Sequence, residues 1–160
     1  MLNGSKSIAF RLIDKGFDVW LNNSRGHLFS LDHQSFDNRN KNNKTLSKEL
    51  KAQMKKYWDF SYHEHGIYDQ PALWNFVLKE TGAQKIQYVC HSQGFTQILI
   101  AMCAYPEFFR KHMSLCVGIA PVHRLNFATC DTIKKLGTKK AALNFAKSLV
   151  NSGILQKPIS

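Results

Sequence analysis

The sequence predicts an α/β fold in which helices flank a parallel sheet. Segments with apolar residues at helical spacing alternate with short apolar runs rich in β-branched and aromatic residues. Glycine and proline separate these segments. The length of 160 residues and the hydrophobic content of 44% allow one domain with a real core. Because helices and strands alternate, we expect parallel strands with helices covering both faces of the sheet.

The first predicted elements are a helix and a strand. Residues 5–16, SKSIAFRLIDKG, have apolar residues on one helical face and end in Gly16, a residue that commonly stops a helix. Residues 17–21, FDVWL, are typical of a short buried strand. The string NNSRGH that follows has the composition of a turn.

A polar segment interrupts this pattern. Residues 36–53 are rich in Asn, Lys and Ser and have little periodicity, which indicates a surface insertion. Order is expected to return at the aromatic string YWDF, residues 57–60.

The second half of the chain has the clearer signals. Pro71 suits the first turn of a helix, and Gly82 suits its end. The predicted elements are a helix over 71–81, a strand over 85–90, a helix over 94–104, a short helix over 106–112 and a strand over 115–120. From residue 123 the chain is basic, and we expect it to be helical.

The string YVCHSQGF places Ser92 between a predicted strand and a predicted helix. A serine in such a turn, with a small residue two places away, is typical of a nucleophile elbow. The helix N-terminus would direct free N–H groups at the site, and that of Gln93 is the expected oxyanion donor. His91 should not reach Ser92, because adjacent strand residues point to opposite faces. Cys90 stands where the elbow pattern has glycine, so some crowding is expected.

The charge and the cysteines limit the alternative functions. The formal net charge is +11, which permits contact with nucleic acid or an anionic lipid surface. The lysines gather around residues 41–56 and 134–147 without interleaved stacking aromatics, so we do not expect nucleic-acid binding. The four cysteines lack CxxC spacing, so we expect neither a metal site nor a cofactor. No apolar run reaches the ~18 residues of a transmembrane segment.

Three strings carry a wider resemblance: SIAFRLIDKGFDVWLNNSRG, YWDFSYHEHGIYDQPA and YVCHSQGFTQ. In this order and spacing they resemble the acid lipase family of α/β-hydrolases, which includes gastric and lysosomal acid lipases and steryl-ester hydrolases. The later stretch VGIAPVHRLNFATC is also similar. The resemblance implies that Ser92 is the nucleophile and that the backbone N–H of Gln93 lines the oxyanion hole. It implies a structural role for the NSRG string, residues 23–26.

The resemblance has departures. Cys90 and Asn22 each replace a family glycine, and the polar insertion lengthens the chain. Asp69 matches a family aspartate; we interpret it as a helix cap, with a catalytic role as the alternative. The family's HG-containing oxyanion loop lies before the first matching string, and its catalytic Asp and His lie far downstream. We therefore expect a partial α/β-hydrolase fold, truncated at both ends, with no triad Asp or His in this chain.

The predicted organisation follows from this. Residues 1–122 would form the central part of the hydrolase core, and residues 123–160 the start of a helical cap. In the family another strand separates the strand matching residues 17–21 from that matching 85–90. Either these two strands pair directly here, or the chain is one piece of a longer one.

Two functions remain open from the sequence. The first is a serine ester hydrolase acting on neutral lipid esters such as triacylglycerols or steryl esters, without a cofactor. The second is a non-catalytic fragment, pseudoenzyme or interaction subunit that keeps the elbow as inherited architecture. The resemblance implies a secretory, lysosomal or lipid-associated location, with contact to a lipid surface.

Overall fold

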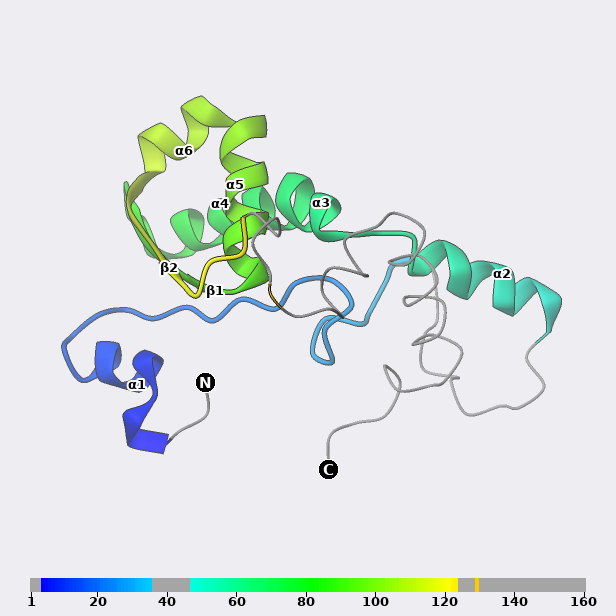
Figure 1. The fold of residues 1–160 in the computed structure, drawn as a ribbon, viewed down its shortest axis with the longest axis horizontal. Coiled ribbons are helices and arrows are strands. Elements are labelled where there is room, and N and C mark those ends of the chain that lie inside the picture. Colours follow the sequence, from blue (N-terminus) through cyan, green and yellow to red (C-terminus); the bar gives the residue numbers. More distant parts are fainter. Residues whose placement is uncertain (1–3, 36–46, 124–128, 130–160) are drawn as a thin grey trace.

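The computed structural model describes residues 4–35, 47–123 and 129. The elements in chain order are η1 (Gly4–Lys6), α1 (Ile8–Ile13), α2 (Lys48–Tyr57), α3 (Tyr62–Glu64), η2 (His65–Asp69), α4 (Gln70–Thr81), β1 (Ile86–His91), α5 (Gln93–Ala104), α6 (Pro106–His112) and β2 (Met113–Ile119) (Figure 1). Here η1 is a 3-10 turn and η2 is a π-helical turn.

Strands β1 and β2 pair in parallel, as the sequence predicts. The register aligns Tyr88 with Cys116 and Cys90 with Gly118. The intervening helices α5 and α6 complete a strand–helix–strand unit, the arrangement that places two parallel strands side by side. The α/β class is confirmed for this part of the chain.

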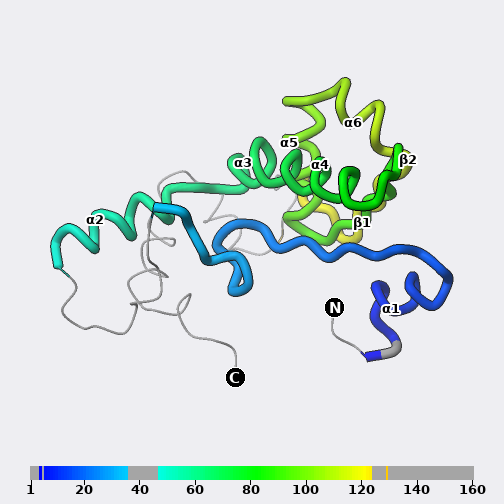
Figure 2. The backbone as a smooth tube through the Cα atoms, turned by 180° about the vertical axis from the view of Figure 1, so that it is seen from behind, coloured from blue at the N-terminus to red at the C-terminus, as the bar shows by residue number. Residues whose placement is uncertain are grey.

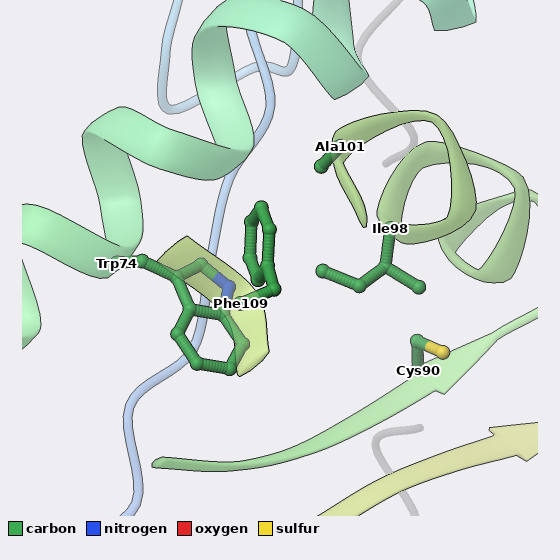
Figure 3. Close-up of a cluster of buried hydrophobic side chains, with 5 residues drawn as sticks. All are labelled: Trp74, Cys90, Ile98, Ala101 and Phe109. Atoms are coloured by element: carbon green, nitrogen blue, oxygen red, sulfur yellow. The ribbon is translucent and has the colours of Figure 1, made fainter. Parts of the chain in front are cut away.

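A single hydrophobic cluster holds this unit together (Figure 3). It consists of Trp74 from α4, Cys90 from β1, Ile98 and Ala101 from α5, and Phe109 from α6. Trp74 and Phe109 meet edge to face, with ring centroids 5.1 Å apart. The three helices therefore cover the face of β1 that carries Cys90.

The opposite face of the sheet is exposed, contrary to the expectation that helices cover both faces. Val89, Leu115 and Val117 are 43%, 50% and 39% exposed. Successive strand residues point to opposite faces, so a strand covered on one side alternates between buried and exposed positions. In β1 the burial does alternate along the strand, which fits a sheet with helices on one side only.

The local signals for α4 are satisfied. Pro71 lies in the first turn, where its missing N–H costs no hydrogen bond. Gly82 ends the helix in the left-handed conformation at φ 68°, which a side chain would make costly. The helix thus spans Gln70–Thr81, one residue longer than expected.

The predicted buried strand over residues 17–21 is wrong. Residues 17–24 are extended but belong to no strand, and they run past the sheet without joining it (Figures 1 and 2). Phe17 is 49% and Leu21 75% exposed. They also do not pair with β1, because the described sheet has the order β1-β2 alone. A strand needs a neighbour to satisfy its backbone groups, and composition cannot supply one.

The other differences are smaller. The helix expected over 5–16 is divided into η1 and α1, and α1 buries none of its residues. Helix α2 begins inside the predicted insertion, and the Ser47 hydroxyl caps it by accepting from Leu50 N–H at 3.2 Å. The rest of that insertion, residues 36–46, and most of the predicted cap, residues 124–128 and 130–160, lie outside the described residues.

Candidate active site

Ser92 lies in the turn that joins β1 to α5, and its backbone is strained. Its φ of 54° and ψ of −121° are unusual for a residue with a side chain. Such conformations persist only where the surrounding structure holds them, and they cluster at functional sites. A serine on a sharp, strained strand-to-helix turn is the defining feature of a nucleophile elbow.

The end of β2 fastens this turn. The Ser92 N–H donates to the Ile119 carbonyl at 3.0 Å, and the Ser92 carbonyl accepts from Val122 N–H at 3.3 Å. The Thr96 hydroxyl in turn donates to the Val122 carbonyl. These bonds attach both backbone groups of Ser92 to the segment that leaves the sheet, so the strain is supported by tertiary contacts.

The start of α5 offers donors to a ligand. Gln93 is the first residue of the helix and is exposed, and the N–H groups of a first helical turn have no intrahelical acceptor. The helix has 12 residues, long enough for its positive end to favour a developing anion. Ser92 is half-buried and His91 is exposed; the hydrogen bonds described include none to the Ser92 hydroxyl.

The crowding expected at Cys90 is relieved by Gly94. A Cβ atom placed on Gly94 would lie 3.3 Å from the Cβ of Cys90, tighter than most such contacts. The Cys90 side chain is 5% exposed, and its thiol faces the Val117 carbonyl at 3.6 Å. Burial raises the pKa of this thiol to about 11, so it stays neutral beside Ser92 at ordinary pH. The strand and helix therefore accommodate sulfur at the glycine position.

Comparisons with known proteins bear on this geometry. The sequence matches no protein-family profile. It is 40% identical over 133 residues to the lysosomal acid lipase/cholesteryl ester hydrolase of Macaca fascicularis and 39% identical over 133 residues to that of Homo sapiens. It is also 39% identical over 135 residues to lipase member M of Homo sapiens. This chain belongs to the acid lipase family. The matches cover 83–84% of the chain but only 27–29% of these three relatives, so the chain spans less than a third of their length.

In this member of the acid lipase family Asp69 does not cap a helix. Its side chain makes no capping bond to α4. It accepts from the Arg25 backbone N–H at 3.0 Å and from Arg25 Nε at 2.7 Å. The Arg25 guanidinium also lies over the Tyr68 ring, 5.5 Å from its centroid. Asp69 thus fastens the NSRG turn to η2, which corrects the capping interpretation and gives no support to a catalytic role.

Gln97 was not singled out from the sequence. Gln97 is 8% exposed, and its side chain contacts three other polar side chains, one each from the NSRG turn, η2 and α4. The available signal was one glutamine in a helix string, GFTQILIAMCA, whose other residues are apolar or small apart from Thr96. A buried amide needs partners, but the sequence does not show which residues supply them.

The described part of this acid lipase family member holds no group of three or more His, Cys, Asp or Glu side chains arranged to bind a metal. Among its described helices, none is both long and apolar enough to cross a membrane.

Proposed function

We propose that the protein carrying this chain is a serine ester hydrolase with Ser92 as its nucleophile and the Gln93 backbone N–H as an oxyanion donor. The observation that carries the proposal is the backbone conformation of Ser92. This residue has a positive φ and lies in the turn between strand β1 and the N-terminus of helix α5. Family membership adds that the named relatives are lipases.

The chemistry would proceed by acyl transfer. Ser92 Oγ attacks the acyl carbonyl carbon while a general base takes the hydroxyl proton, a role that the acid lipase pattern gives to a histidine downstream of these residues. The carbonyl oxygen becomes an anion facing the Gln93 N–H. The base returns the proton to the departing alcohol, and water then hydrolyses the acyl-enzyme.

The substrate class follows from the relatives. Two of them are named cholesteryl ester hydrolases, so we propose neutral lipid esters, steryl esters and triacylglycerols among them. The names of the same two relatives contain the word lysosomal, which supports a lysosomal location for this protein. We further propose an α/β-hydrolase fold truncated at both ends in this chain, with residues 1–122 in the core and residues 123–160 opening the cap.

A fluorophosphonate probe tests the nucleophile. We expect it to label Ser92 in the complete protein, Ser92→Ala to abolish labelling, and Ser114→Ala, which alters an exposed serine on β2, to retain it. Absence of labelling in the folded complete protein would overturn the proposal. It would favour the alternative that the chain serves a non-catalytic, interaction role. If only the isolated 160 residues stay unlabelled, catalysis requires residues outside them.

A further inference from the structure

The buried amide of Gln97 lies where three segments meet. Its Oε1 accepts from the Ser24 hydroxyl at 3.3 Å and from Gln70 Nε2 at 3.4 Å. Its Nε2 lies 3.0 Å from His65 Nδ1 and donates to it. Ser24 belongs to the NSRG turn, His65 to η2 and Gln70 to α4, so one side chain of α5 joins all three.

Helix α5 and the turn η2 pack closely beside this amide. A Cβ atom on Gly66 would lie 2.6 Å from Ile100 Cγ2 and 2.8 Å from the Gln97 carbonyl oxygen. Helix α5 therefore packs directly against the backbone of η2. Gln70 is fully buried, and His65 Nε2 is buried without a partner in the described structure. A polar group in such a place is costly unless it is bonded, so the Gln97 bonds fix the local arrangement.

The position of Gln97 on its helix connects it to the candidate active site. Gln93 and Gln97 are four residues apart in α5, so they lie on one face, one turn from each other. The NSRG turn docked on Gln97 thus lies along the helix end that carries the oxyanion donor. A second attachment, the Arg25–Asp69 ion pair at 2.6 Å, holds the same turn to η2.

We propose that Gln97 is a positioning residue. Its bond to Ser24 docks the NSRG turn on α5 and prevents the helix from rotating. This keeps Ser92 Oγ and the Gln93 N–H in the relative positions that the reaction requires. This inference rests on the proposed function, because it assigns Gln97 a role in the reactivity of Ser92.

The test compares labelling kinetics in the complete protein. Gln97→Met keeps the side-chain size but removes all three bonds. We expect the maximal fluorophosphonate labelling rate to fall by about tenfold to a hundredfold, because small misplacements in an active site carry losses of this size. The probe concentration giving half of that rate should stay the same. Trypsin should cleave after Arg25 faster in this variant, since the turn is released.

Two further variants separate positioning from general destabilisation. Ile98→Val alters the adjacent, fully buried core residue and should lower the melting temperature without slowing labelling. Ser24→Ala should slow labelling, Ser24→Thr should restore it by keeping the hydroxyl, and the Ser24→Ala, Gln97→Met pair should be no slower than Gln97→Met alone.

The outcomes distinguish the two proposals. Normal labelling of Gln97→Met, or a loss no greater than that of Ile98→Val at equal melting temperature, overturns the positioning role and leaves the nucleophile intact. A complete wild-type protein that is folded but unlabelled overturns the proposed function and the positioning role with it.

Discussion

The segment from α3 to β2 and the segment of residues 4–35 differ in where their apolar side chains lie. In the first, Trp74, Ile98 and Phe109 are at most 2% exposed. In the second, Ile8, Ile13 and Leu28 are 50–60% exposed, although their chemistry is similar. Both segments contain sequence signals for helix and strand. The difference shows that a signal leads to buried structure only where a partner surface is present.

The two segments are not independent, because polar contacts join them. Arg25 binds Asp69, Ser24 binds Gln97, and Trp20 packs edge to face on Phe76 with ring centroids 5.9 Å apart. The NSRG turn is therefore fixed to the segment from α3 to β2, called the packed segment below, whereas helix α1 buries none of its residues. Four predictions test this contrast, and they are ordered from the largest expected effect.

The largest effect is expected in the core. Ile98→Ala should lower the free energy of unfolding by about 2–5 kcal/mol, because it leaves a cavity beside Ala101 and Cys90. Ile13→Ala in α1 removes the same atoms from an exposed site. It should change the free energy of unfolding by less than about 0.5 kcal/mol. Urea unfolding of both variants measures the difference. Equal losses would show that α1 is packed as well as the core.

The second largest effect is expected from breaking the attachment of the NSRG turn. Asp69→Asn removes the carboxylate charge that holds Arg25 and should cost about 1.5–3 kcal/mol, the range for hydrogen bonds to charged groups. Asp18→Asn is the matched control, because the Asp18 carboxylate accepts a hydrogen bond from the exposed indole N–H of Trp20, two residues away, and not from the NSRG turn. Trypsin cleavage after Arg25, followed by mass spectrometry, reports on release of the turn. Unchanged cleavage in Asp69→Asn would mean that the ion pair does not hold it.

A smaller effect is expected from alkaline pH, and it should arise in the packed segment. Burial raises the pKa of Cys90 to about 11 and that of Tyr88 to about 12, from ordinary values of 9.0 and 10.0. The unfolded chain loses these protons first, so the free energy of unfolding is at its full value below about pH 9 and falls as the pH rises from 9 towards 12.

Urea midpoints measured between pH 8 and 11 check this dependence. Tyr88→Phe has no phenol to ionise and Cys90→Ala has no thiol, so each should flatten the alkaline slope. If the wild type and both variants fell with the same slope, ionisation elsewhere would be responsible.

The smallest effect should come from the aromatic contact between the segments. Trp20 is 43% and Phe76 53% exposed, so their contact is only partly shielded from water. A double-mutant cycle of Trp20→Ala and Phe76→Ala should give a coupling energy of about 0.5 kcal/mol. A coupling near zero would mean that residues 17–21 are held by the NSRG turn alone.

Much of the packed segment could be predicted from the sequence. Pro71 and Gly82 bracket α4, and the apolar runs on both sides of Ser92 become β1 and α5. These signals are local, because caps, turns and periodicity act within a few residues. The same local pattern placed Ser92 in a strand-to-helix turn, and the observed φ of 54° agrees with it.

The errors have a common cause. The string FDVWL has strand composition, but residues 17–21 pair with no other strand in the described structure. Asp69 precedes α4 as a cap would, yet its carboxylate is bonded to Arg25, 44 positions away. In both cases a distant segment, or the lack of one, decides the outcome, and composition contains no information about it.

The sequence by itself determined, to within two residues, where α4, β1, α5, α6 and β2 begin and end, although it did not predict α3 or η2. It also placed a serine between a strand and a helix. It did so because backbone preferences and capping depend on near neighbours. Only the tertiary structure decided which residues support that serine. Ile119 and Val122 hold its backbone, Gly94 makes room for Cys90, and Gln97 binds the NSRG turn. Apart from the Gly94–Cys90 contact, which lies within the turn itself, these contacts join residues that lie far apart in the chain, so their geometry exists only once the fold has brought them together.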